Sequence, residues 1–206
     1  MFQALNATST TLVEYLQDSI DADPFFGTSG HPWRDRNMRV SLQTPSEMVQ
    51  SPSDEGVSFW LYRVVRDEER LNDPPRRISP TQLRPPPLPV RLHYLVTPIT
   101  NRANAGDPDT EQYALGKVMQ LLHSKPRFRG ADLRAQFAGT DVELFVRLET
   151  LSLDEITRVW EGLNGEYQLS ISYEVSSVEI EAALEPDSVT PVLVSLPEMG
   201  IITGTV

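Results

Sequence analysis

Two runs of sequence decide the fold: Gly56-Val57-Ser58-Phe59-Trp60-Leu61-Tyr62-Arg63-Val64-Val65-Arg66 and Pro89-Val90-Arg91-Leu92-His93-Tyr94-Leu95-Val96-Thr97-Pro98. Both are rich in the β-branched and aromatic residues that are typical of strands. Apolar groups occupy both faces of the first run, which predicts a central strand that is covered on both sides. Neither run carries a recognisable catalytic motif. The pair therefore indicates a building block or a binding surface rather than an enzyme.

The segment between these runs, residues 67–88, is expected to be a loop or an arm. Seven prolines fall between Pro74 and Pro89, and proline cannot donate a hydrogen bond to a sheet. One interpretation is a solvated connection of polyproline II character. We favour a docking arm, because long structureless loops are uncommon in compact domains unless they are functional or disordered. Its interface candidates are the arginines in or beside it: Arg66, Arg70, Arg76, Arg77 and Arg84.

Helical and strand patterns alternate along the rest of the chain. Apolar spacing predicts helices over residues 3–20 and from Asp107-Pro108 to about His123, and a capping box starts a third at Ser152. Strands are expected at residues 38–42, at 141–149 and at 167–181, the last being the longest and bulged at Ser176-Ser177. The predicted class is α/β (α+β): a single domain with a mixed, mainly antiparallel sheet flanked by helices.

The region from Glu185 onward has a different character. Strand-like residues are interrupted by Pro186, Pro191 and Pro197. Such a segment can fold back as an edge strand or add a strand to the sheet of another subunit. We therefore divide the chain into a domain over residues 1–182 and an extended C-terminal arm over residues 183–206. The interface candidates in this arm are Val192, Leu193, Val194, Ile201 and Ile202.

Composition excludes several classes of site. The 206 residues include no cysteine, so disulfides, thiolate zinc sites and iron–sulfur clusters are ruled out. The opening residues do not read as a secretory signal, and no apolar stretch approaches the ~18 residues of a membrane-spanning helix. We therefore expect a cytoplasmic protein that does not insert into a membrane.

The net charge of −11 is unevenly distributed. From Asp141 to the end, the chain has thirteen acidic and two basic residues. This acidic third opposes binding to a nucleic-acid backbone. Two interpretations of the charge stay open at even weight: a soluble acidic surface, or a polarised molecule in which unlike faces of neighbouring subunits meet.

Catalytic and metal-binding patterns are weak. No two of the histidines, His31, His93 and His123, have the i, i+4 spacing of a helical metal pair, and no phosphate-binding glycine motif is present. Asp154 and Glu155 open a helix, where carboxylates favour the helix dipole. Trp60 and Trp160 are expected to anchor the core rather than to stack on bases. We expect no catalytic residue, no cofactor and no metal.

Five blocks, in order along the chain, carry a family resemblance. Besides Gly56–Val64 and Val90–Pro98, they are Leu115-Gly116-Lys117-Val118-Met119-Gln120-Leu121-Leu122-His123, Leu151-Ser152-Leu153-Asp154-Glu155-Ile156-Thr157-Arg158-Val159-Trp160 and Tyr167-Gln168-Leu169-Ser170-Ile171-Ser172-Tyr173-Glu174-Val175. Together they resemble the tail-terminator, or cap, proteins of extracellular contractile injection systems. These systems are phage-tail-like particles with an inner tube and a contractile sheath. The resemblance covers about Thr8 to Ile180 and excludes the segment from Glu185 onward.

The resemblance implies a hexameric ring at the end of the tail farthest from the baseplate, with no catalysis and no cofactor. The implied partners are further copies of the chain and the tube and sheath proteins of the same particle. We hypothesise that residues 192–206 pair with a sheath subunit by strand addition, and that residues 67–88 contact the neighbouring subunit or the tube. The particle would assemble in the cytoplasm and then stay there, attach to a membrane or be released.

Two alternatives remain open at this point. The chain could be another tail component, such as a tube-end adaptor or a baseplate part. Less favoured is a small-molecule-binding α/β domain, which would need a convergent pocket with perturbed titratable groups.

Overall fold

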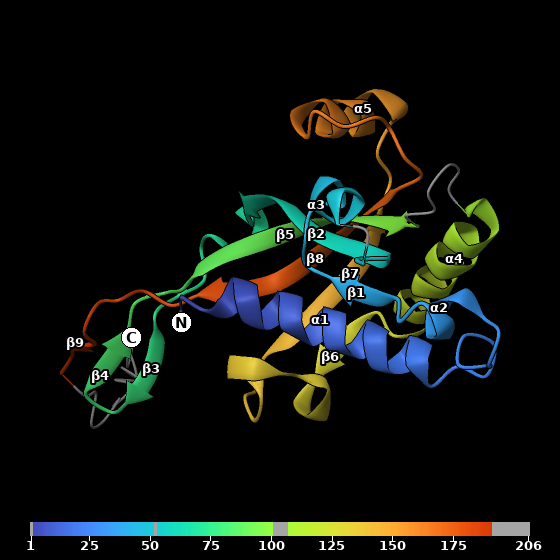
Figure 1. Cartoon of the computed structure of the whole chain (residues 1–206). Coiled ribbons are helices and arrows are strands. Elements are labelled where there is room, and N and C mark those ends of the chain that lie inside the picture. Colours follow the sequence, from blue (N-terminus) through green and yellow to red (C-terminus); the bar gives the residue numbers. More distant parts are fainter. Residues whose placement is uncertain (1, 52, 101–106, 191–206) are drawn as a thin grey trace, which may run out of the picture.

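The computed structural model describes residues 2–51, 53–100 and 107–190. A six-stranded sheet, in the order β1-β2-β5-β8-β7-β6, forms the body, and a separate three-stranded sheet, β3-β4-β9, lies at one end of it (Figure 1). The strands are β1 (Arg39–Ser41), β2 (Gly56–Arg66), β3 (Arg76–Ser79), β4 (Gln82–Arg84), β5 (Leu88–Ile99), β6 (Arg127–Arg129), β7 (Glu143–Glu149), β8 (Ile171–Ile180) and β9 (Asp187–Ser188). The α-helices are α1 (Ala4–Asp21), α2 (Pro32–Asp35), α3 (Pro45–Gln50), α4 (Pro108–Ser124) and α5 (Leu153–Gly162), with 3-10 turns η1 (Glu68–Arg70), η2 (Gly130–Asp132) and η3 (Ala135–Phe137).

The large sheet is mixed and mainly antiparallel, as predicted. Only β1 runs parallel to its neighbour, β2, and the other pairings are antiparallel. Gly56 makes the β1–β2 contact possible. Its φ is +139°, and a Cβ atom at this position would lie 2.0 Å from the carbonyl oxygen of Arg39. A side chain is therefore excluded where the two strands meet.

One face of the sheet packs against α1 and α4. The apolar side chains of β2 and β5 on this face are fully buried: Phe59, Leu92, Tyr94 and Val96. The hydroxyl groups of Ser9, on α1, and Tyr94 lie 2.8 Å apart, so the polar end of this buried tyrosine is satisfied. The predicted helices over residues 3–20 and 107–123 are confirmed as α1 and α4, with Asp107 as the N-cap of α4.

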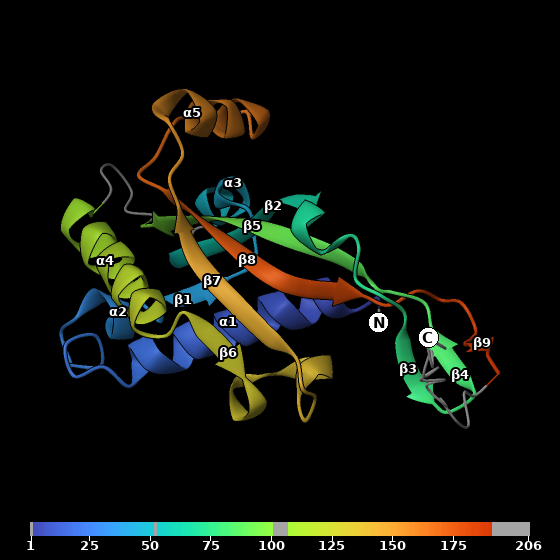
Figure 2. The same ribbon diagram turned by 180° about the vertical axis from the view of Figure 1, so that it is seen from behind.

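The opposite face is covered only in part by α3 and α5, which lie on the other side of the sheet from α1 (Figures 1 and 2). A small second core forms there from Leu95, Ile156 and Trp160, with Trp60 packed against it. The prediction that β2 is covered on both sides is therefore correct only for its first half. From Arg63 onward most of its side chains are exposed.

β8 differs from the strand expected over residues 167–181. It begins at Ile171, and β5, with twelve residues, is the longest strand. The preceding residues are held by other bonds: Trp160 Nε1 donates to Ser170 Oγ at 3.1 Å, and Ser170 Oγ donates to the Gln168 carbonyl. The predicted bulge is confirmed, since the register with β5 shifts at this point and Ser177 has a φ of 65°.

Residues 67–88 are not the continuous loop that the prolines indicated. They contain η1 and a β-hairpin of β3 and β4, in which Arg77 lies opposite Leu83. The prolines flank the two strands or, at Pro80, occupy the turn, so the residues that must donate ladder bonds keep their N–H groups. We call residues 67–88 the arm.

The C-terminal region folds back in part. β9 pairs with β4, where Leu83 lies opposite Asp187, and the Val189 N–H donates to the carbonyl of Thr81 at the hairpin turn. The capping box at Ser152 is confirmed at the start of α5. The interface candidates Val192, Leu193, Val194, Ile201 and Ile202 lie outside the described residues.

Candidate interaction surfaces

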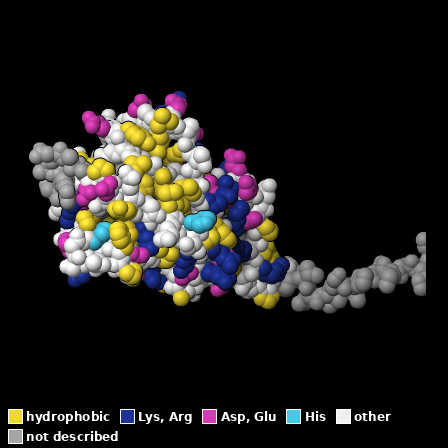
Figure 3. Space-filling model, turned by 90° about the vertical axis from the view of Figure 1, so that its right-hand side faces the viewer, with side chains coloured by type: hydrophobic (Ala, Val, Ile, Leu, Met, Phe, Trp, Pro, Cys, Tyr) yellow, Lys and Arg dark blue, Asp and Glu magenta, His cyan; other side chains and the backbone are white. Residues whose placement is uncertain are grey.

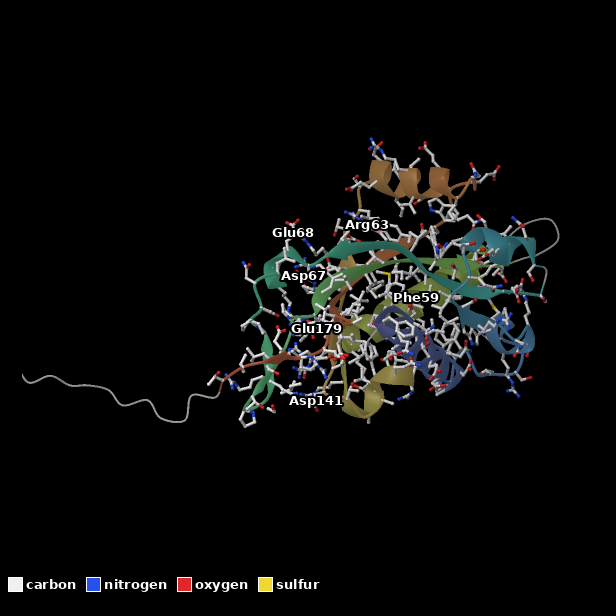
Figure 4. The ribbon with its side chains drawn as sticks, turned by 90° about the vertical axis from the view of Figure 1, so that its left-hand side faces the viewer. Phe59, Arg63, Asp67, Glu68, Asp141 and Glu179 are labelled. Carbon is white, nitrogen blue, oxygen red and sulfur yellow. The ribbon has the colours of Figure 1, made fainter. Side chains whose placement is uncertain are left out.

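The arm is fastened to the body by ion pairs at the end of β8. Arg70 Nη2 donates to Glu179 Oε1 at 2.7 Å, and Arg76 Nη2 donates to both carboxylate oxygens of Glu179 at 2.7 and 2.8 Å. Arg84 Nη1 lies 3.0 Å from Glu181 Oε1. Figure 4 shows Glu179 at the junction between the hairpin and the large sheet. Three of the five predicted interface arginines therefore have partners within their own chain.

The other two arginines of the predicted interface are differently placed. Arg66 is exposed at the end of β2, and Arg77 is exposed in β3, where its Nη1 donates to the Pro80 carbonyl at 2.7 Å. In the described part of the chain neither has an acidic partner. Arg66, beside the arm, and Arg77, within it, are thus the interface candidates whose charge is available to another molecule.

The first residue of the arm, Asp67, is a buried carboxylate that pairs with Arg91. Arg91 Nη2 lies 2.8 Å from Asp67 Oδ1 and 3.1 Å from Glu69 Oε2, and the Asp67 N–H donates to the Pro89 carbonyl. Burial alone would raise the pKa of Asp67, but the hydrogen bond from Arg91 and its charge hold that pKa below the ordinary value. This contact fixes where β2 ends and the arm begins.

A polar network lies on the partly covered face of the sheet. His93 Nδ1 is 3.0 Å from Glu149 Oε2. The same carboxylate oxygen accepts a hydrogen bond of 2.7 Å from Ser172 Oγ, and the Tyr62 hydroxyl is 3.1 Å from that Ser172 oxygen. Burial raises the pKa of Glu149, but hydrogen bonds from His93 and Ser172 outweigh it and hold that pKa below its ordinary value. Ser172 is bonded to the carboxylate rather than to the imidazole, so this is not a nucleophile–base pair.

An apolar groove opens between α4 and the sheet, with a volume of about 660 Å³. α4 contributes Gly116 and Met119, and the sheet contributes Val146 and Leu148 from β7 and Tyr173 from β8. Figure 3 views this end of the molecule and shows hydrophobic side chains gathered there, with Lys and Arg side chains beside them. This groove is not among the surfaces predicted from the sequence. The signal was that α4 carries Met119, an apolar residue outside its buried stripe, on the groove side.

A second hollow, of about 490 Å³, lies beneath the arm. It is lined by Arg70, Arg76 and Glu179 on one side and by Asp141 and Phe145 on the other. Figure 4 shows Asp141 below Glu179 at this end of the molecule. Most of the residues that line the hollow are charged, and its arginines already pair with Glu179. The hollow is therefore a gap between the arm and the body and a poor candidate for a ligand pocket.

Two further properties of the described residues concern metal binding and membrane insertion. Among residues 2–51, 53–100 and 107–190, no group of three or more histidine, aspartate or glutamate side chains is placed to hold a metal ion. None of the helices in that part of the chain is long and apolar enough to cross a membrane.

The fold and these surfaces define a class: a one-domain α/β protein with an ion-paired arm and an open apolar groove, both suited to contacts with other chains. The chain belongs to the family described as the Pvc16 N-terminal domain, whose family model matches residues 7–193. The tail-terminator family predicted from the sequence is thereby confirmed. A search of curated proteins finds no match.

Two solved structures have the same fold. One is the sheath/tube terminator of the extracellular contractile injection system PVC in its extended state, with a TM-score of 0.59, 17% identity, and coverage of 100% of this chain and 65% of that one. The other is the tube-terminating cap of the anti-feeding prophage, with a TM-score of 0.57, 19% identity, and coverage of 95% and 60%. The chain thus spans somewhat less than two thirds of the length of these structures.

Proposed function

We propose that this protein is a tail terminator: a ring that closes the baseplate-distal end of a contractile injection system and ends the polymerisation of its tube and sheath. The observation that carries this proposal is the likeness in fold, over the whole chain, to a sheath/tube terminator, together with membership of the Pvc16 N-terminal domain family. The role is structural and needs no catalytic group or cofactor.

The surfaces give this role a physical basis. A closed ring of identical chains requires two different patches on each copy, one meeting the other around the axis. The arm projects from one end of the large sheet, and α4, which lines the apolar groove, lies toward the other end (Figures 1 and 2). In our proposal the arm contacts the neighbouring subunit or the tube, and the exposed Arg66 and Arg77 supply its charge. Six copies per ring remain the expected number.

The particle would assemble in the cytoplasm. Other components of the particle would decide whether it then stays there, attaches to a membrane or is released. The partners in this proposal are the inner-tube and sheath proteins, and they include neither nucleic acid nor a membrane.

Polymer length tests the function directly. Tube and sheath subunits are assembled with increasing amounts of the full chain, and the lengths are measured by electron microscopy. We expect the mean length to fall as the chain is added, with a ring at one end of each particle. A double variant, Arg66→Glu with Arg77→Glu, should cap less well. Unchanged lengths, with no protein at the ends, would contradict the proposal, and a ring at the baseplate end would identify another tail component.

A further inference from the structure

One edge of the large sheet is open where it borders the apolar groove. β6 pairs only with Glu143, Leu144 and Phe145 of β7, and the Val146 N–H then donates to the Pro126 carbonyl at 2.8 Å. The last residues of β7, Arg147 to Glu149, pair with β8 on one side. On their other side, the described residues provide no strand. Because backbone groups alternate along a strand, the N–H of Leu148 faces the same open side as that of Val146.

The side chains beside this edge are unusually exposed for apolar groups. Leu148 is 51% exposed and Met119, across the groove, is 37% exposed. Open edges and exposed apolar patches mark places where another chain adds a strand. The backbone edge would supply hydrogen bonds to an incoming strand, and the groove would accept its alternate side chains.

Gly116 provides an independent indication that something approaches α4 closely. It lies within α4, and a Cβ atom at this position would have nothing within 4 Å. Neither packing nor backbone conformation in the single chain therefore requires glycine, yet glycine within a helix costs about 0.5–1 kcal/mol relative to alanine. A partner in the groove would explain the residue, because a side chain here would occupy the space that the partner needs.

The chain itself contains a segment of the right chemistry. Between Pro191 and Pro197, Val192, Val194 and Leu196 alternate with Leu193 and Ser195. That alternation gives one wholly apolar face, and none of these residues is charged. A five-residue strand is enough to span the open part of β7, where Arg147 to Glu149 pair with β8 on one side only.

Geometry excludes the chain's own groove as the acceptor. Val194 is four residues beyond Thr190 and so lies at most about 14 Å from it. Leu148 lies opposite Tyr173, which lies opposite Tyr94 on β5. Tyr94 is six residues, or about 20 Å, along β5 from Leu88, where the arm joins the sheet. Thr190 follows β9, on the hairpin, which extends further away in both views (Figures 1 and 2). The segment therefore cannot reach its own groove, and only the groove of another copy is open to it.

We infer that residues 192–196 of one copy add as a strand to the open edge of β7 in the next copy, with Val192, Val194 and Leu196 in the groove between α4 and the sheet. This inference rests on the proposed function in that a ring places the next copy within reach. It replaces the sheath pairing expected from the sequence for residues 192–206 at its first five residues, and leaves residues 201–206 for a sheath contact.

The absence of cysteine from the chain allows a direct test. Full-length protein is made with Leu148→Cys and one donor cysteine, at Val192, Val194 or Leu196 in turn, and is oxidised without tube or sheath. We expect disulfide-linked multimers on non-reducing gels for at least one pair. The matched control replaces Leu148→Cys with Leu153→Cys, at a side chain on α5 that is 71% exposed. A specific contact brings the donor segment to Leu148 and not to Leu153, so the control should give at least about tenfold less linkage.

A blocking variant separates this contact from random collision. Gly116→Trp fills the groove from an open position in α4, so the fold should persist, which circular dichroism checks. It should abolish the multimers, and Gly116→Ala should weaken them less. Linkage that survives Gly116→Trp, or disulfides that form only within one chain, would overturn the inference. Protection of the groove from solvent that appears only when sheath subunits are added would also overturn the inference, since the occupant would then be a sheath strand.

The test does not depend on capping. Cysteine-pair protein with Gly116 intact that fails to link but still shortens tubes would overturn this inference and leave the terminator function intact. Cysteine-pair protein, otherwise wild type, that links but never caps would contradict the function and support the contact.

Discussion

The body and the arm of this protein are held by different forces. In the body, α1 and α4 cover a sheet face on which Phe59, Leu92, Tyr94 and Val96 are fully buried. In the arm, the side chains of β3 and β4 are exposed or half-buried, and Arg–Glu pairs make the contacts with β8. Burial of apolar area is the larger stabilising force, and partly exposed ion pairs contribute little. The body can therefore stay fixed while the arm adjusts to a partner.

The largest expected effect comes from a substitution in the body. Phe59→Ala removes a fully buried ring that packs on Tyr94, with 4.7 Å between ring centroids. The free energy of unfolding should fall by about 3–5 kcal/mol, measured by urea denaturation. Ile78→Ala in the arm, where the side chain is 45% exposed, is the matched control and should cost less than about 0.5 kcal/mol. Equal effects would remove the distinction between the two regions.

Gly56→Ala tests the backbone of the body. Its Cβ atom would meet the backbone of Arg39, and a φ of +139° is strained for any other residue. We expect a loss of about 1–3 kcal/mol of unfolding free energy, with faster hydrogen exchange in β1. Gly130→Ala is the control, because its Cβ atom would meet nothing within 4 Å although its φ is also positive. If both variants behave alike, then steric exclusion at β1 is not the reason for Gly56.

Acid should weaken two sets of contacts that need an ionised carboxylate: those of Asp67 at the start of the arm and those of Glu149 in the polar network of the sheet. The pKa values of Asp67 and Glu149 are lowered in the folded protein, so the stability they contribute is present above their unfolded values of 3.8 and 4.5 and is lost as pH falls through the lower folded values. Asp67→Asn should cost about 1–3 kcal/mol at pH 7 and proportionally less near pH 3, measured by urea denaturation at each pH. A cost that stays constant with pH would contradict this assignment.

The smallest effect on overall stability is expected for Glu179→Gln, which removes the anchor of the arm. The cost should be below about 1 kcal/mol, since Arg76 and Glu179 are partly solvated. Hydrogen exchange of residues 76–84 should nevertheless accelerate, and added salt should have the same effect on wild-type protein. Glu185→Gln, on an exposed residue, is the control. No change in exchange would mean that β9, rather than the ion pairs, holds the arm.

The sequence predicted the body better than the arm, for a physical reason. Alternation in β5 and helical spacing in α1 report burial directly, and the capping box at Ser152 is a local hydrogen-bond pattern. The hairpin was missed because proline was taken to break the whole segment, whereas Pro75 and Pro85 only bracket its two strands.

The surfaces were harder to predict than the elements. The arginines of the arm were found, but their partner, Glu179, is more than a hundred residues away in the sequence, and no local pattern links them. The groove depends on where β6 ends beside β7 and on how far α4 covers the sheet. Both are properties of the tertiary arrangement. Gly116 lay within a predicted helix, but its open surroundings became visible only in three dimensions.

The most direct test of the terminator proposal is the mass of the purified protein in solution, measured by light scattering alone and with tube and sheath subunits. We predict a mass near six chains, or a ring that forms only when tail ends are present. A monomer that binds neither tube nor sheath under any condition would contradict the proposal and indicate an independent binding domain.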